Sequence, residues 1–245
     1  MTTVPRVAVF RPDDDRLARA VELLESLDME AIADPMLAVE PAGSTPRSDA
    51  DVVVFTSTTG VDLVANTEWT PDDATICAIG ETTAQALRDT GFEVDVVPET
   101  YTSGGLVEAL ESEVESARVE LARSDHGSPV LVDGLFEAGG YVHETVLYRL
   151  VRPDGAGESA EMAAAGELDA ALFTSSLTVE HFLEAATERG VREAAIDGLN
   201  EAVVGTIGPP TKETAESNGI DVDVVPETAD FERLARAVVE QLQSN

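Results

Sequence analysis

The chain has 245 residues, which is enough for one large domain or for two compact ones. Its 48 acidic residues outnumber its 15 basic residues and give a formal net charge of −33, a surface that repels nucleic acid and anionic membranes. The 43% hydrophobic content and the regular apolar runs exclude a disordered acidic chain. We therefore expect a folded protein adapted to a very salty cytoplasm, where a Debye length of about 3 Å screens self-repulsion.

A disulfide framework and a cysteine-based zinc site are excluded because Cys77 is the only cysteine. The first residues lack the pattern of a signal peptide, and no apolar run approaches the roughly 20 residues of a membrane span, so we expect a cytoplasmic protein. His126, His143 and His181 are scattered and are interpreted as solvated or helix-face residues, so no metal site is predicted. Lys212, the only lysine, is expected to be exposed at a helix start.

The first half of the chain alternates between strands and helices. The strands are short runs of Val, Ile and Ala without polar alternation, as expected where helices cover both faces of a parallel sheet. Up to residue 110 we predict strands at 7–10, 30–33, 52–56, 76–79 and 94–97, and helices at 14–27, 82–89 and 103–110.

The second half continues the same alternation. Two further apolar, extended segments, 36–40 and 146–151, are bounded by prolines and look like crossings between two domains. From residue 129 we predict strands at 129–132, 142–148, 170–173, 202–207 and 222–225, and helices at 178–188, 211–217 and 231–241.

An internal repeat organises these elements. The run VDVVPET occurs at residues 94–100 and again at 222–228, an offset of 128 residues. DVVVFTS at 51–57 matches DAALFTS at 169–175, so a loop of different length lies inside the shared unit. The order of elements is (βαβ)(βαβαβα) twice, which predicts two similar α/β domains of flavodoxin-like type, each with a five-stranded parallel sheet.

Serines and threonines gather where the predicted strands end and the helices begin. Ligands of open parallel sheets bind beyond the carboxyl ends of the strands, and a helix N-terminus offers free backbone N–H groups and partial positive charge to a carboxylate. Each hydroxyl also has a purely structural interpretation as a helix N-cap. The clusters are 56–59, 82–83, 100–103, 174–176 and Thr211.

In order, spacing and duplication, these motifs closely resemble the uroporphyrinogen-III synthase family. The resemblance rests on both FTS strand ends, both G-x-x-T turns (80–83 and 208–211), both VDVVPET runs, Tyr101-Thr102-Ser103 and VLYRLVRP at 146–153. It covers nearly the whole chain, although each short motif alone is unspecific.

The resemblance implies a discontinuous first domain, 1–35 plus 153–245, and a second domain, 41–146, joined by linker strands at 36–40 and 147–152. The repeat taken alone suggests a cut near residue 120, and the two proline-bounded segments favour the family's arrangement. It also implies a cofactor-free lyase that closes hydroxymethylbilane to uroporphyrinogen III in tetrapyrrole biosynthesis, and a monomer with at most transient contact with hydroxymethylbilane synthase.

The site residues follow from the same resemblance. Tyr148 resembles a family tyrosine and is the candidate that assists departure of the substrate hydroxyl; packing of the linker is its alternative role. The candidate substrate-binding residues are Arg11, Ser57, Thr58, Gly80, Thr83, Tyr101, Ser103, Ser175, Ser176, Gly208 and Thr211.

One departure from the family concerns the turn after the predicted strand at 130–132. The family usually has an arginine-bearing loop there, whereas this chain has DGLFEAGG at 133–140, so that face is expected to contribute less to binding. The turn after the first strand keeps Arg11 and Pro12.

Two other functions fit parts of the pattern. A non-catalytic ligand-binding or sensor protein shares the plan of two linked α/β domains, and a regulatory protein could carry a synthase-like module. The chain lacks spare length and a basic surface for an added DNA-binding domain. The glycine pairs at 104–105 and 139–140 form neither a dinucleotide fingerprint nor a P-loop.

Overall fold

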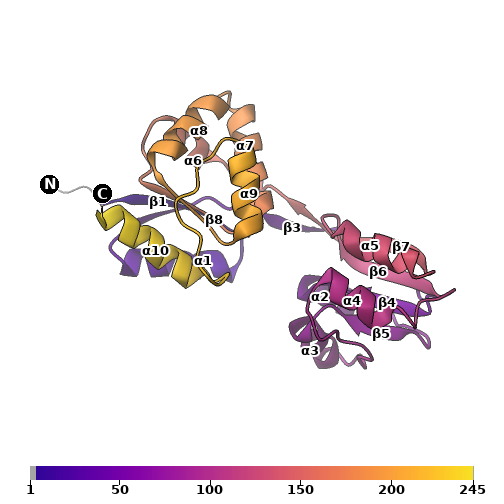
Figure 1. The fold of residues 1–245 in the computed structure, drawn as a ribbon. Coiled ribbons are helices and arrows are strands. Elements are labelled where there is room, and N and C mark those ends of the chain that lie inside the picture. Colours follow the sequence, from indigo (N-terminus) through magenta and orange to yellow (C-terminus); the bar gives the residue numbers. More distant parts are fainter. Residues whose placement is uncertain (1–3, 245) are drawn as a thin grey trace. The chain divides into compact units, whose positions relative to one another are not determined.

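The structure is a computed structural model that describes residues 4–244, and it divides into two compact units (Figure 1). Unit 1 combines residues 4–38 and 151–244, and unit 2 is the continuous segment Val39–Leu150. The chain leaves unit 1 between Ala38 and Val39 and returns between Leu150 and Val151. Each of the two predicted linker segments contains one of these passage points.

Unit 1 is built on a four-stranded sheet in the order β2-β1-β8-β9. Each neighbouring pair is parallel, with Val7 opposite both Ala31 and Ala170. The predicted parallel α/β class is confirmed, but the prediction of five strands is wrong for this sheet, which has four. The strands are β1 (Arg6–Phe10), β2 (Glu30–Ala33), β8 (Ala170–Phe173) and β9 (Val203–Thr206).

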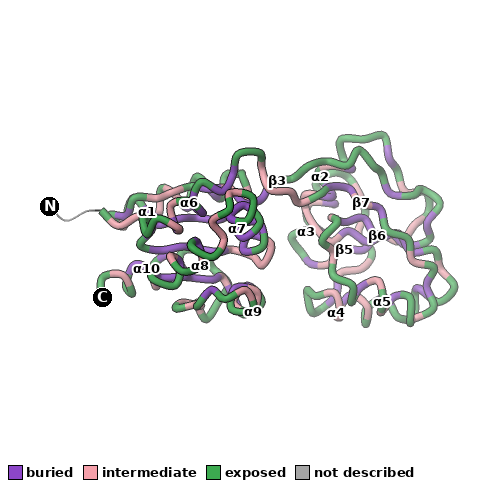
Figure 2. The backbone as a smooth tube through the Cα atoms, turned by 90° about the horizontal axis from the view of Figure 1, so that it is seen from above, coloured by how far each residue is buried: buried purple, intermediate pink, exposed green. Residues whose placement is uncertain are grey.

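Helices cover both faces of this sheet. Along β1, Val7 and Val9 join one hydrophobic cluster, while Ala8 and Phe10 join the other, as the alternation of a strand requires. The first cluster is closed by α1 (Asp15–Ser26) and α10 (Phe231–Ser244). The second is closed by α6 (Glu158–Ala164), α7 (Ser176–Glu188), α8 (Arg192–Glu201) and α9 (Pro209–Ser217). Figure 2 shows buried segments in the interior of this unit and exposed segments along the outer turns of its helices.

Unit 2 contains a five-stranded sheet in the order β3-β7-β6-β4-β5. The pairs β4–β5, β4–β6 and β6–β7 are parallel. Its strands are β3 (Ala38–Pro41), β4 (Val52–Phe55), β5 (Thr75–Ala78), β6 (Arg118–Ser124) and β7 (Tyr141–Val151).

Two helix pairs sandwich this second sheet. On one face lie α2 (Thr58–Ala65) and α3 (Glu81–Asp89), with Phe55, Trp69 and Tyr148 in the same cluster. On the other face lie α4 (Ser103–Leu110) and α5 (Pro129–Glu137), which bury leucines against Val54 and Leu121.

The repeat is visible in individual hydrogen bonds. The Asp169 carboxylate accepts from the backbone N–H of Arg6 at 2.7 Å, and the Asp51 carboxylate accepts from the backbone N–H of Arg118 at 2.8 Å. In the VDVVPET runs, Asp95 accepts from Ile76 N–H and Asp223 accepts from Val204 N–H, both at 2.8 Å. The equivalent strands of the two units are therefore β1 and β6, β2 and β7, β8 and β4, and β9 and β5.

The prediction that each VDVVPET run begins with a full strand is wrong. Segment 94–97 contributes only the parallel bridge of Val96 to Cys77, and segment 222–225 only the bridge of Val224 to Gly205. The carboxylate of the aspartate at the second position accepts a hydrogen bond from a backbone N–H of the neighbouring strand, which is β5 or β9. A proline follows at the fifth position of each run. Pairing therefore stops after one bridge.

The predicted strand at 129–132 is also wrong, because these residues begin α5. The Ser128 side chain accepts from Val130 N–H at 3.3 Å, and Pro129 occupies the first helical turn, which is a helix start signal. The true strand is β6, whose sequence RVELARS was not predicted because it carries charged residues. Glu120 is 1% exposed within it and accepts its hydrogen bond from His143. Helices α6 and α8 were not predicted either.

The surplus of acidic residues predicts a fold that is stabilised by salt. Self-repulsion at a net charge of −33 opposes the compact state, and its range falls from about 10 Å at 0.1 M salt to about 3 Å at 1 M. We expect the midpoint of thermal unfolding, measured by circular dichroism, to rise steadily as potassium chloride increases from about 0.1 M to about 2 M. A midpoint that is constant or falls over this range would contradict adaptation to a salty cytoplasm.

Candidate active site at the carboxyl edges of the two sheets

The parallel pairing gathers helix starts at one edge of each sheet. Because parallel strands end on the same side, every helix that follows such a strand begins there. In unit 2 these helices are α2, α3 and α5, and in unit 1 they are α1, α7 and α9, while α4 and α10 follow the two VDVVPET runs. The first turn of a helix carries backbone N–H groups without an intrahelical acceptor, and such groups can bind a carboxylate. Pro129 in α5, and Pro209 and Pro210 in α9, supply no such donor.

A bonded pair of hydroxyls lies at this edge of unit 2. Ser57 is the N-cap of α2, and its Oγ accepts from Gly60 N–H at 3.0 Å. Tyr148, on β7, donates its phenol O–H to the same Oγ at 2.9 Å. Tyr148 is 7% exposed and its ring packs in the core, whereas Ser57 is partly exposed. The structure thus brings together the predicted catalytic residue and one predicted binding residue.

Gly80 and Tyr101 form a second contact at the same edge. Gly80 is the N-cap of α3, and a Cβ built on it would lie 3.2 Å from Cγ of Tyr101. Tyr101 itself is 61% exposed. The extended backbone at Gly80 suits any residue, so glycine is favoured here by the close approach of the ring, which a Cβ would force to shift by a few tenths of an ångström.

The other predicted residues of unit 2 occupy helix first turns. Thr58 and Ser103 are the first residues of α2 and α4, and both are partly exposed. Thr83, on the first turn of α3, is only 5% exposed, so its side chain belongs mainly to the interior. Its backbone N–H remains part of the helix start.

In unit 1, Ser175 caps α7 in a reciprocal arrangement. Its Oγ accepts from Thr178 N–H at 3.2 Å, while the Thr178 hydroxyl meets the Ser175 backbone N–H at 3.3 Å. The neighbouring Ser176 donates to the Pro210 carbonyl oxygen and accepts from the Thr214 hydroxyl at 2.9 Å. These contacts tie the start of α7 to the start of α9.

Gly208 and Thr211 mark the start of α9. Gly208 is its N-cap, and a Cβ built on it would meet nothing within 4 Å, unlike its repeat counterpart Gly80. Thr211 is 3% exposed, so, like that of Thr83, its side chain belongs mainly to the interior, and its backbone N–H lies in the first turn of α9.

Arg11 is the predicted residue with the clearest electrostatic signature. Its guanidinium lies 4.5 Å from the centre of the Phe231 ring, and its Nε is buried without a hydrogen-bond partner in the described part of the chain. Burial, followed by the nearby charge of Arg16, lowers the pKa of Arg11. An anion would supply the missing acceptor and the compensating charge.

The prediction that unit 2 lacks the equivalent arginine is wrong, because the equivalent strand is β6 and not the segment 130–132. Arg123 follows Arg118 as Arg11 follows Arg6, five positions later, and the repeat RVAVFR against RVELAR could have revealed it. Arg123 is 6% exposed, forms an ion pair with Glu144 and donates to the Ser128 carbonyl oxygen at 2.7 Å. Unlike Arg11, it is fully engaged within its own unit.

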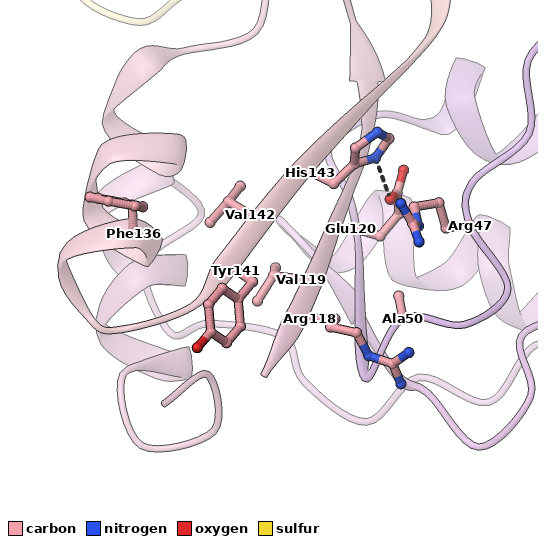
Figure 3. Close-up of a pocket in the computed structure, with 9 residues that line it drawn as sticks. All are labelled: Arg47, Ala50, Arg118, Val119, Glu120, Phe136, Tyr141, Val142 and His143. Atoms are coloured by element: carbon pink, nitrogen blue, oxygen red, sulfur yellow. Dashed lines mark hydrogen bonds and ion pairs between the residues drawn. The ribbon is translucent and has the colours of Figure 1, made fainter. Parts of the chain in front are cut away.

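A pocket of about 370 Å³ lies away from these residues, at the amino ends of β6 and β7 (Figure 3). The exposed aromatic side chains of Phe136 and Tyr141 flank it, and the buried Glu120 lies 2.8 Å from Nδ1 of His143 beside it. Residues 118 and 141 begin their strands, so this pocket is at the edge opposite to the helix starts. The residues that line it do not include the predicted site residues.

Within residues 4–244, no group of His, Cys, Asp and Glu is arranged to hold a metal ion. None of the described helices is long and apolar enough to cross a membrane. Burial raises the pKa of the Cys77 thiol to about 12, so this cysteine is a core residue and not a nucleophile.

The two repeated units, each with helix starts at the carboxyl edge of its sheet, define an α/β protein with two parallel-rich sheets. The family model for uroporphyrinogen-III synthase HemD matches residues 18–236. The chain belongs to the uroporphyrinogen-III synthase family. Members of this family are hydro-lyases of tetrapyrrole biosynthesis.

Two relatives are similar to this chain in sequence, and two solved structures are similar to it in fold. A protein of Methanothermobacter thermautotrophicus, provisionally named uroporphyrinogen-III synthase, is 35% identical over 90% of this chain and 92% of its own length. The uroporphyrinogen-III synthase of Chlorobaculum parvum is 26% identical over 97% and 99%. A mutant Thermus thermophilus synthase structure has a TM-score of 0.68 at 22% identity, covering 99% of this chain and 100% of its own. The Helicobacter pylori synthetase has a TM-score of 0.66 at 14% identity, covering 98% and 100%. The two structures support the fold.

The repeat offers a matched test of the contact between Gly80 and Tyr101. We expect Gly80→Ala to lower the free energy of unfolding by about 1 kcal/mol more than Gly208→Ala. The methyl group added at position 80 would contact the Tyr101 ring, whereas the one added at position 208 would contact nothing. Both substitutions place alanine at the N-cap of the equivalent helix, so the capping cost cancels. Chemical denaturation measures the difference, and equal losses would show that Tyr101 moves freely.

Proposed function

We propose that this chain converts hydroxymethylbilane, a linear tetrapyrrole with many carboxylates, to uroporphyrinogen III, with loss of water and inversion of ring D. The observation that carries the proposal is the repeated edge of helix N-termini, in both units, within a chain of this family. Each edge supplies backbone donors suited to carboxylates without requiring basic side chains.

The backbone donors also explain how a polyanion binds a polyanion. Repulsion from the acidic surface acts at long range and is screened by salt. Hydrogen bonds from helix first turns act at contact distance and survive screening. We propose that Ser57, Thr58, Gly80, Thr83, Tyr101 and Ser103 in unit 2, and Arg11, Ser175, Ser176, Gly208 and Thr211 in unit 1, bind the substrate.

Catalysis is proposed to be mainly a matter of geometry. The hydroxyl leaves ring A, and the chain then closes at the substituted carbon of ring D through a spiro intermediate. Unaided closure gives the uninverted isomer, so the protein must hold one near-attack geometry and needs few acid or base groups. Tyr148 is the proposed residue that assists the departing hydroxyl. We further propose that the protein acts as a cytoplasmic monomer, without nucleic-acid or membrane partners, since its net charge is −33.

The isomer ratio of the product tests this function directly. Purified protein in high salt would receive hydroxymethylbilane from a coupled deaminase, and the oxidised products would be separated by chromatography. We expect isomer III to predominate, with isomer I alone in a heat-inactivated control. Isomer I alone from the active sample would refute synthase activity, and tight binding without turnover would instead support a ligand-binding protein.

Arg11 is expected to contribute to substrate binding more than to the chemical step. Arg11→Met keeps an apolar side chain against Phe231 and removes the charge, so we expect KM to rise about tenfold while kcat stays within about twofold. Arg233→Met, at an exposed position of α10 in the same unit, makes the same change in net charge and should leave both constants unchanged. Steady-state kinetics at fixed salt measures both variants. An unchanged KM for Arg11→Met would remove Arg11 from the binding site.

A further inference from the structure

The hydrogen bonds of Ser57 leave its hydroxyl with a single remaining function. A serine hydroxyl has one O–H donor and two acceptor lone pairs. At Ser57 both acceptor positions are used, by the Gly60 backbone N–H at 3.0 Å and by the Tyr148 phenol at 2.9 Å. The Ser57 O–H is therefore the group left to contact a ligand at this edge.

Tyr148 lies behind Ser57 with respect to solvent. Its ring is buried in the cluster between the sheet and the helices α2 and α3, and it is 7% exposed, whereas Ser57 is partly exposed. The phenol proton is directed at Ser57 Oγ. Tyr148 consequently reaches the ligand edge through Ser57.

The other repeat shows that the fold does not need this pair. The bridge between Ser124 and Tyr148 in unit 2 corresponds to the bridge between Pro12 and Leu37 in unit 1, so Leu37 occupies the place of Tyr148. Ser175, the counterpart of Ser57, instead exchanges hydrogen bonds with Thr178.

Glycine at position 60 makes the difference possible. Gly60 stands where unit 1 has Thr178, three residues after the capping serine. A Cβ on Gly60 would lie 3.2 Å from Leu147 Cδ1 and 3.2 Å from Ser57 Oγ. The absence of a side chain therefore lets β7 pack closely enough for the Tyr148 phenol to reach Ser57.

We propose that Ser57 donates the proton to the departing hydroxyl of the substrate, and that Tyr148 is the positioning residue that polarises Ser57 and restores its proton. This inference rests on the proposed function. As the bond between carbon and hydroxyl breaks, Ser57 O–H protonates the oxygen, which leaves as water. The Tyr148 proton moves to Ser57 Oγ, and the electron pair remains on the phenol oxygen. The substrate carries the positive charge until ring closure releases a proton, which returns to Tyr148.

The relay has a chemical reason. A serine alone is a poor acid, because a free alkoxide would remain after proton transfer. A phenol behind it accepts that negative charge far better, and a chain of donors strengthens each bond in it. The N-terminal end of α2, which Ser57 caps, adds partial positive charge at the same oxygen.

Four variants and a control test the relay. We expect Ser57→Ala to lower kcat at least about 100-fold with little change in KM, and Tyr148→Phe to lower kcat about tenfold. Adding Tyr148→Phe to Ser57→Ala should cost nothing further, because the two groups act in series. Ser57→Thr keeps the hydroxyl and should retain most activity. Thr67→Ala removes a hydroxyl that is hydrogen-bonded to Val64 and Trp69 beyond the opposite end of α2, and it should leave kcat unchanged.

Separate readouts keep the outcomes distinct. Thermal unfolding should show a larger loss for Ser57→Ala than for Thr67→Ala, because only Ser57→Ala removes a helix cap and leaves the buried Tyr148 phenol without its hydrogen-bond partner. The inference is overturned if Ser57→Ala retains more than half of kcat, or if Tyr148→Phe costs the same factor with and without Ser57. Failure of the function itself looks different, because the unaltered protein would then yield only isomer I.

Discussion

The parallel register of the two sheets is the constraint on which the site depends. Because neighbouring strands run in one direction, each crossover helix must begin at the same edge, and its unpaired N–H groups are gathered there without any specific side chain. Polar caps such as Ser57 and Ser175 then satisfy some of these groups and leave others free. A strongly acidic protein can thereby present electropositive positions whose strength does not depend on lysine or arginine. Arg11, which lies over the Phe231 ring, adds one formal positive charge to unit 1.

The internal repeat gives each unit an equivalent carboxyl edge, and the two edges differ in their side chains. The carboxylates of Asp51 and Asp169 hold equivalent strand starts in the same way, which shows how closely the frameworks agree. The divergence lies in side chains at the carboxyl edge. Unit 1 holds a half-buried arginine against an aromatic ring, whereas unit 2 buries its equivalent, Arg123, against Glu144 and instead presents a hydroxyl pair. One copy is therefore better suited to attract charge and the other to move a proton.

Much of this could be predicted from the sequence, because the repeat constrains each element twice. The predicted bounds of strand β8 and helix α4 match the structure to the residue. A short apolar run marks β8, and a capping threonine marks the N-terminal end of α4. Strand β6 was missed because Glu120 and Arg123 look like surface residues until their partners in β7 are known. The pairing of Tyr148 with Ser57 was not predictable either, since the two residues are 91 positions apart and meet only when β7 packs beside α2.

The two VDVVPET runs have a consequence for solubility. In each, an aspartate side chain occupies a main-chain donor of the outermost strand, and a proline soon ends any further pairing. Open sheet margins invite other chains to add to them, which is how many β-rich proteins begin to aggregate. Like charges normally keep molecules apart, yet concentrated electrolyte removes that protection. Because further pairing is blocked at the edge strands β5 and β9, we expect these edges to resist aggregation even at salt concentrations that screen the repulsion between acidic surfaces.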